Sequence, residues 1–185
     1  MTGIFAARRP RLRKVVIGVA NVLMTIPSLA LFGFAIILLA PINAGIGVPP
    51  AIFALIIYSL LPIIRNTILA LHSVSSGVVE AAKGMGMSSP QILFKIQLPL
   101  ALPLLMAGVR NAVVMGVSVT TIAYLVGAQG LGYFLFAGLS RTRGDMVVIG
   151  SLLVALLGIG ANYLLFRLEN LLTPKGVKLQ QGVKK

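Results

Sequence analysis

The sequence contains no cysteine and no tryptophan, and its three acidic residues are outnumbered by 16 lysines and arginines. Without cysteine the chain can form no disulfide, no thiolate metal site and no cysteine nucleophile. The acidic residues are Glu80, Asp145 and Glu169, and their separation along the chain argues against catalysis by paired carboxylates. His72 is the only histidine, whereas a metal site needs several converging ligands. We therefore expect neither an enzyme nor a bound metal.

The sequence also lacks the usual sources of energy for transport. It contains no Gly-x4-Gly-Lys-Ser/Thr loop, so the chain cannot hold the phosphates of ATP itself. Its apolar segments carry no carboxylate or histidine relay of the kind that proton-coupled carriers use. No cofactor is expected on this chain, and any active transport would depend on energy supplied by a partner.

Hydrophobic residues, in contrast, make up 58% of the 185 residues, charged residues only 10%, and the mean hydropathy is +1.02. A soluble domain is about one quarter charged, so this composition indicates a polytopic membrane protein. Apolar blocks of this length can cross the ~30 Å hydrocarbon core of a bilayer as helices. The predicted fold class is an all-α membrane bundle with about four spans, at residues 15–40, 51–71, 99–127 and 146–166.

The net charge of +13 is concentrated mainly at the two chain ends and in a polar stretch at residues 79–99. Lysine and arginine hold loops on the cytoplasmic side during insertion, so these three segments are predicted to be cytoplasmic. The basic residues would then contact anionic lipid headgroups rather than nucleic acid. The expected organisation is a basic segment at 1–14, a transmembrane domain at 15–170 and a basic tail at 171–185, all in the cell membrane.

Polar and helix-breaking residues inside the predicted spans are candidates for a translocation path. Pro27 would either kink the first span or break it beside a polar path. Arg65 is expected to reach the headgroups by snorkelling, whereas Arg110 has no acidic partner in any predicted span and should use carbonyls, water, lipid or another subunit. The alternative for these polar residues is a set of backbone-bonded hydroxyls and a snorkelling arginine. The candidate path residues are Pro27, Ser28, Asn66, Arg110, Asn111, Ser118, Thr120 and Thr121.

The polar stretch at residues 79–99 is the one long interval between apolar blocks that is also helix-competent. Glu80 is predicted to lie in the first turn of a short helix, where the helix dipole favours a negative charge. Gly86 suits a left-handed helix stop, and Ser89-Pro90 suits an N-cap followed by proline at the first helical position. We expect a docking element of two helices that can move the membrane spans at its ends. The alternative is a plain loop.

The same stretch carries a known family pattern. Glu80-Ala81-Ala82, three residues, Gly86, nine residues and then Ile96-x-Leu98-Pro99 match the pattern EAA-x3-G-x9-I-x-LP. The match resembles the EAA loop of ABC importer permeases, in which this loop docks on the ATPase subunit as a coupling helix. The resemblance implies a methionine-importer-like permease fold. It assigns coupling to the ATPase to Glu80, Ala81, Ala82, Gly84, Gly86, Ile96, Leu98 and Pro99.

Four segments resemble the osmoprotectant branch of these permeases, which import glycine betaine, carnitine, choline or similar quaternary amines. They begin at Thr25, Leu61, Glu80 and Gly127, and the similarity extends over residues 3–172. It implies two ABC ATPases that hold ATP and Mg, a second permease subunit, identical or homologous, and an extracytoplasmic substrate-binding protein. The last of the four segments contains the candidate outer gate, Gly130, Leu131 and Gly132.

The sequence departs from this family in two places. The usual first helix is missing before residue 15, which predicts either a truncated variant or an upstream start. Gln129 also stands where a glycine is expected. Two other functions therefore stay open: a permease for amino acids such as methionine, and a non-transporting, truncated membrane scaffold.

Overall fold

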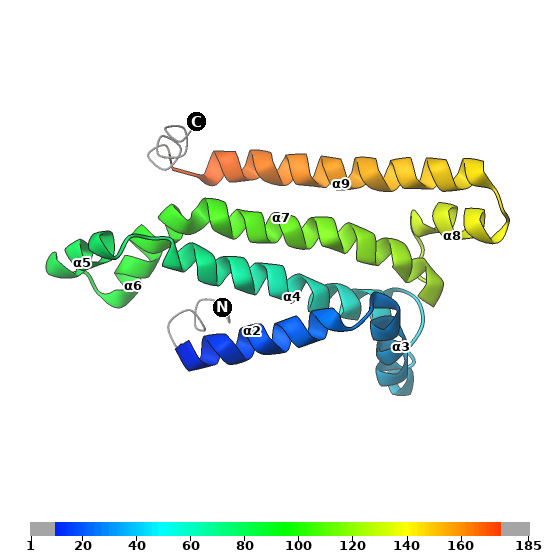
Figure 1. The fold of residues 1–185 in the computed structure, drawn as a ribbon, viewed down its shortest axis with the longest axis horizontal. Helices are drawn as coiled ribbons and strands as arrows, with labels where there is room; N and C mark the ends of the chain where they lie inside the picture. The colour runs from blue at the N-terminus through cyan, green and yellow to red at the C-terminus, as the bar shows by residue number, and fades with distance from the viewer. Residues whose placement is uncertain (1–9, 175–185) are drawn as a thin grey trace.

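The structure is a computed structural model that describes residues 10–174, and four long helices pack side by side along its length (Figure 1). Two short helices extend the bundle at one end, and two more cap the other. No strand occurs within residues 10–174, so the predicted all-α fold is confirmed. The long helices, in packing order, are α2 (Pro10–Thr25), α4 (Val48–His72), α7 (Leu98–Ile122) and α9 (Gly144–Leu172). The short ones are α5 (Ser76–Gly84) and α6 (Ser89–Ile92) at one end and α3 (Ser28–Leu39) and α8 (Gly132–Ser140) at the other.

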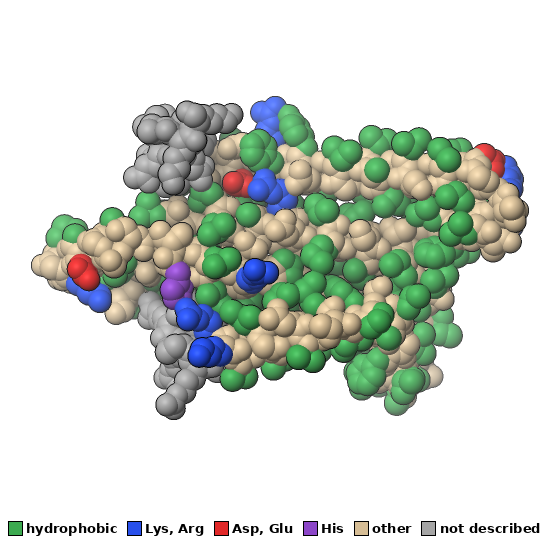
Figure 2. Space-filling model, viewed as in Figure 1, with side chains coloured by type: hydrophobic (Ala, Val, Ile, Leu, Met, Phe, Trp, Pro, Cys, Tyr) green, Lys and Arg blue, Asp and Glu red, His purple; other side chains and the backbone are tan. Residues whose placement is uncertain are grey.

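Three helical stretches in residues 10–174 are long and apolar enough to cross a membrane: Val48–His72, Ser89–Val126 and Gly144–Leu172. A bent pair, Arg13–Thr25 and Ser28–Ile42, brings the number to four if it counts as one span. Charged side chains are sparse along the middle of the bundle and gather towards its ends (Figure 2). The apolar middle and charged ends fit a bilayer, in agreement with the predicted set of spans.

The first predicted span is broken at Pro27 rather than gently kinked. The axes of the two halves differ by 99°, and Pro27 itself has extended backbone angles (φ −56, ψ 140). Proline disfavours a helical conformation in the residue before it, so α2 ends just ahead of Ile26. The Ile26 carbonyl, left outside the helix, accepts a hydrogen bond from the Tyr58 hydroxyl on α4. Pro27 has no N–H group and so cannot bond the carbonyl of Leu23, four residues before it. The Thr25 hydroxyl does not replace this donor, because it donates to the carbonyl of Val22 at 2.7 Å.

The third span is longer than predicted because helix α6 runs into α7 without a break. A π-helical turn, η2 (Leu93–Gln97), joins them, and a 3-10 turn, η3 (Ala123–Val126), ends the span. The N-cap is Ser88 and not Ser89, because Ser88 forms a capping box with Gln91, whose side-chain oxygen accepts from the Ser88 amide at 2.8 Å. Ser89 and Pro90 are the first two helical residues.

The connector predicted at residues 127–145 contains a further helix, α8, which packs against the start of α9. Helix α9 also continues past the predicted end of the span at residue 166, up to Leu172. Its end is set by Pro174, since the residue before a proline is driven out of the helical conformation. These six further residues place Glu169 on the helix, next to α7.

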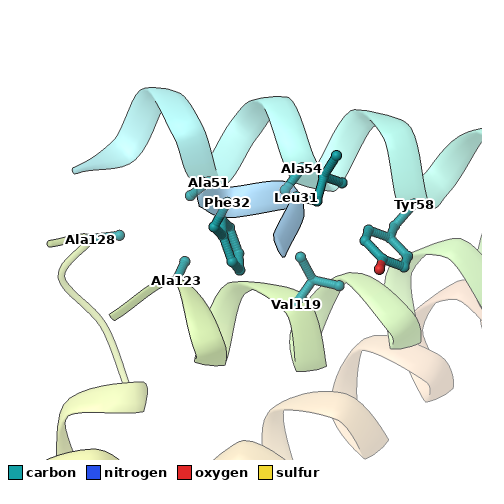
Figure 3. Close-up of a cluster of buried hydrophobic side chains, with 8 residues drawn as sticks. All are labelled: Leu31, Phe32, Ala51, Ala54, Tyr58, Val119, Ala123 and Ala128. Atoms are coloured by element: carbon teal, nitrogen blue, oxygen red, sulfur yellow. The ribbon is translucent and has the colours of Figure 1, made fainter. Parts of the chain in front are cut away.

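The largest buried cluster joins α3, α4 and α7 at the end where α8 lies (Figure 3). Phe32 from α3 is completely buried, in a cluster with Ala51 and Ala54 of α4, Val119 of α7 and Ala123 of η3. Small residues let helices approach closely in a membrane, where van der Waals packing drives their association. The cluster comprises Leu31, Phe32, Ala51, Ala54, Tyr58, Val119, Ala123 and Ala128.

Replacing Phe32 with alanine should lower the free energy of unfolding by about 3 kcal/mol, because the removed ring leaves a cavity. Phe34, which is 59% exposed against 0% for Phe32, provides a matched control on the same helix. Thermal unfolding in detergent should show a clear decrease for Phe32→Ala and little change for Phe34→Ala. Equal effects would contradict the packing of α3 against α4 and α7.

Candidate translocation cavity and coupling element

A cavity of about 1030 Å³ lies between α4, α7 and α9. Apolar side chains form most of its wall, and a few polar groups interrupt them. Cavities of this size with sparse polar groups are typical of small-molecule sites. The polar lining residues are Arg65, Asn66, Asn111, Ser118 and Asn162.

The cavity brings together three of the eight predicted path residues: Asn66, Asn111 and Ser118. The other five, Pro27, Ser28, Arg110, Thr120 and Thr121, are not part of its wall.

Thr120 and Thr121 bond their own helix, to the carbonyls of Gly116 (2.9 Å) and Val117 (2.8 Å). Such back-bonding is common for hydroxyl side chains in membrane helices. These two threonines therefore fit the alternative of backbone-satisfied hydroxyls.

Two cavity residues were not among the predicted ones. Arg65 was expected to snorkel away from the path, yet it lines the cavity, and no described residue forms a hydrogen bond or ion pair with it. Asn162 is an amide inside the predicted span at residues 146–166, a signal that the sequence offered, since polar groups are costly inside a membrane and are retained for function.

Glycines on α7 allow the close contact between α4 and α7 that forms one wall of the cavity. A Cβ atom at Gly108 would lie 2.6 Å from the Asn66 Cβ and 2.9 Å from the Pro62 carbonyl oxygen. One at Gly116 would lie 2.8 Å from a methyl group of Leu55. Asn66 is held in place by its own hydrogen bond to the Pro62 carbonyl, at 2.8 Å.

Arg110 has an acidic partner within this chain, which corrects the sequence prediction. Its Nη1 lies 3.2 Å from Oε2 of Glu169, and the side chains are 25% and 15% exposed. The guanidinium also lies 5.8 Å from the centre of the Phe166 ring, within the range of a cation–π contact. The prediction was wrong because it ended the last span before Glu169, whereas α9 continues through it.

The predicted coupling element consists of α5, a turn, α6 and the start of α7, and it projects at one end of the bundle (Figure 1). Helix α5 begins earlier than expected, after its N-cap Ser75, so Glu80 lies beyond the first turn and the dipole argument does not apply to it. Glu80 and Ala81 are exposed, whereas Ala82 is completely buried. Helix α5 therefore exposes one face, which includes the small side chain of Ala81, and buries the opposite face at Ala82.

Gly86 stops this helix in the left-handed conformation, with φ +78, as the sequence predicted. Nothing lies within 4 Å of the position where its Cβ would be, so the backbone angle alone calls for glycine. Gly84 is the last residue of α5 and has equally open surroundings. Downstream, Ile96 lies in the π-helical turn and Leu98 and Pro99 begin α7, all three partly buried.

A second, smaller cavity of about 390 Å³ separates α5 from the ends of α4 and η2, and Glu80 and Lys83 line it. His72, on its rim, has its Nδ1 2.9 Å from the Ile68 carbonyl and its Nε2 2.9 Å from Nη1 of Arg13. The carbonyl can only accept, so the donor lies at Nδ1 and Nε2 accepts from the arginine. The contact joins α2 to the end of α4, which is a structural role for the single histidine.

The candidate outer gate lies at the opposite end. A Cβ at Gly132 would lie 2.0 Å from the Thr121 carbonyl oxygen, so α8 begins directly against the end of α7. Gly130 is exposed and Leu131 half-buried. The amide of Gly47 donates to the Val126 carbonyl at 2.8 Å and ties the start of α4 to the same place.

No group of three or more metal-ligating side chains occurs within residues 10–174. Comparison with protein families matches residues 1–176 to the binding-protein-dependent transport system inner membrane components. The chain belongs to this family. It is thus a transport permease, and the EAA-type pattern of α5 to α7 is part of a permease domain that covers nearly the whole sequence.

Curated relatives of this permease are similar over most of both chains. The osmoprotectant import permease protein OsmW of Salmonella typhimurium is 46% identical over 176 residues, 95% of this chain and 82% of the relative. The carnitine transport permease protein OpuCB of Listeria monocytogenes is 40% identical, over 96% of this chain and 79% of its own length. The choline transport system permease protein OpuBB of Bacillus subtilis is 36% identical, over 95% and 79%.

Among solved structures, the permease resembles a chain of the MetNI methionine ABC transporter in an inward-facing conformation. The TM-score is 0.81 over 94% of this chain and 85% of the other, with 24% identity. The likeness confirms the predicted methionine-importer-like permease fold.

Replacing Gly108 with alanine should force α4 away from α7 and lower the free energy of unfolding by about 2 kcal/mol, the usual cost of overpacking. Gly160 of α9 is the matched control, since nothing lies within 4 Å of its Cβ position. Thermal unfolding in detergent should place Gly108→Ala below the parent and Gly160→Ala at or slightly above it, because alanine favours a helix. A Gly108→Ala protein as stable as the parent would contradict the close contact.

Proposed function

We propose that this chain is the membrane-spanning subunit of an ABC importer for osmoprotectants such as glycine betaine, carnitine, choline or similar quaternary amines. The observation that carries the coupling part is the continuity of the coupling element. The helix with the Glu80 to Gly86 pattern projects beyond the bundle, and α6, η2 and α7 form one helical run from it to the cavity. The substrate class is supported by the names of the relatives.

The proposed partners follow from what the chain does not supply itself. Two ABC ATPases would bind ATP and Mg; one would dock on the exposed face of α5 around Ala81, and the other on the corresponding helix of the second permease subunit. The residues proposed for this contact and its transmission are Glu80, Ala81, Ala82, Gly84, Gly86, Ile96, Leu98 and Pro99. A second permease subunit, identical or homologous, would close the open side of the cavity. The end of the bundle that bears α5, the start of α2 and the end of α9 would face the cytoplasm.

In this mechanism, closure of the ATPases on ATP pushes α5, and the helical run from Ser89 onward passes the displacement to α7. The cavity then changes the side to which it opens. Nucleotide can shift this equilibrium only by binding the two arrangements with different affinity. Asn66, Asn111 and Ser118, together with Arg65 and Asn162, would line the path, and residues 130–132 would close it on the outer side.

Selectivity is assigned to the binding protein on the outer side. Proteins often recognise quaternary ammonium groups with aromatic cages. The described lining of the cavity contains no phenylalanine or tyrosine, and the sequence contains no tryptophan. The permease would therefore pass what the binding protein delivers, as a wide and weakly polar path.

Uptake by the assembled transporter tests this function. Reconstituted with its ATPase and its binding protein, the permease should accumulate radiolabelled glycine betaine, carnitine or choline in vesicles only when ATP is present. Methionine should not compete. Competition by methionine would favour an amino-acid importer, and absence of uptake for every substrate would favour a non-transporting membrane scaffold.

Replacing Gly86 with valine should separate ATP hydrolysis from uptake, because a β-branched residue at φ +78 costs about 1–3 kcal/mol and redirects the turn after α5. Gly77→Val is the matched control, since Gly77 lies in helix α5 outside the proposed coupling residues and its Cβ would meet only the Ser75 hydroxyl oxygen, at 3.7 Å. Substrate transported per ATP hydrolysed should fall at least about five-fold for Gly86→Val and change little for Gly77→Val. Unchanged transport by Gly86→Val, with normal insertion of both variants, would count against the coupling role.

A further inference from the structure

Helix α9 is held to the rest of the bundle mainly at its two ends. Only 6% of its most apolar window is buried, against 28% for α4 and 22% for the span that contains α7. At one end Gly150 packs so tightly on α8 that a Cβ there would lie 2.8 Å from the Phe134 Cβ. Between the ends, the 1030 Å³ cavity separates part of α9 from α4 and α7.

The other end of α9 is fixed by the ion pair between Glu169 and Arg110. Side chains on a helix lean towards its N-terminus, so Arg110 points along α7 towards the coupling element. Glu169 also lines a 360 Å³ cavity with Ser73, just past the end of α4, and with Leu100, Pro103 and Leu104 at the start of α7. The pair therefore lies where three helices meet beneath the coupling element.

The surroundings make this contact strong and specific. Oε2 of Glu169 is buried and has no hydrogen-bond partner among the described residues, so the nearby guanidinium is its electrostatic compensation. A buried charge that loses its partner is far more costly than a surface charge, and salt screens such a pair weakly. Phe166, from the same turn of α9, contacts the guanidinium as well.

We propose that Glu169 and Arg110 are positioning residues for energy coupling. The pair fastens the end of α9 to α7, so that a displacement of α7 carries α9 with it and both walls of the cavity move as one body. The inference rests on the proposed coupling through α5 to α7 and adds α9 to it. Without the pair, α7 would move while α9 stayed behind, and ATP would be hydrolysed without a change in the access of the cavity.

The test measures substrate transported per ATP hydrolysed in reconstituted vesicles for Glu169→Gln, Arg110→Gln and the charge-reversed double variant Arg110→Glu with Glu169→Arg. Each single variant should lose about ten-fold in this ratio, while ATP hydrolysis stays within about two-fold of the parent. The double variant should recover much of the ratio. Arg167→Gln is the matched control, because Arg167 lies on the same turn but bonds the Tyr163 hydroxyl, at 2.8 Å from its Nε.

The outcomes are distinct. If the single variants keep the parental ratio of transport to ATP hydrolysis, the inference is overturned. It is also overturned if this ratio and the rate of ATP hydrolysis both fall in proportion to the amount of complex lost on size-exclusion chromatography, because the pair is then structural only. If the single variants do not assemble, the charge-reversed double variant is the test. A double variant that assembles and couples transport to ATP hydrolysis supports the inference. A double variant that assembles without coupling, or that does not assemble, contradicts it. Failure of the proposed function differs from all of these, since the parent transporter itself would then show no uptake.

Discussion

The close contact between α4 and α7 is the constraint on which the rest of this permease depends. In a membrane, helices gain little from hydrophobic burial, so they must approach closely enough for extensive van der Waals contact. Gly108 and Gly116 permit that approach at two places where a Cβ would collide with α4. The same two helices lead directly into the coupling element, α4 before it and α7 after it. A tight α4–α7 pair therefore gives the projecting helix α5 a firm base.

Two contacts between polar side chains fasten the outer helices to this pair. Arg13 and His72 join α2 to the end of α4, and Arg110 and Glu169 join α9 to α7. Ions are costly inside a bilayer, so each such contact fixes one arrangement of helices strongly. The middle of the bundle is left apolar and carries a cavity with mostly uncharged polar groups. The helices are therefore joined firmly near the coupling element and less closely around the cavity, an arrangement that suits a path whose shape must change.

The sequence predicted the elements whose signals are local and missed those that depend on neighbouring helices. Hydropathy located the spans, and the left-handed stop at Gly86 followed from its chemistry. The 99° turn at Pro27 could not be predicted from the sequence, because proline allows either a kink or a break in a helix. The hydrogen bond from Tyr58 of α4 to the Ile26 carbonyl favours the break, and it depends on how α4 packs. Arg65 and Asn162 line the cavity only because α4 and α9 face each other across it. The ion pair of Glu169 was missed because the last span was predicted to end at residue 166, six residues before the end of α9.

During transport the coupling element and α7 should move as one body. Because the chain has no cysteine, spin labels can be attached at introduced cysteines alone, here at the exposed residues Met85 and Val113. Pulsed electron paramagnetic resonance on the reconstituted transporter should give the same distance between labels at positions 85 and 113 without nucleotide and with ATP. The distance from Val113 to a label in the second permease subunit should change. A Met85–Val113 distance that changes while the distance between subunits stays fixed would contradict the account.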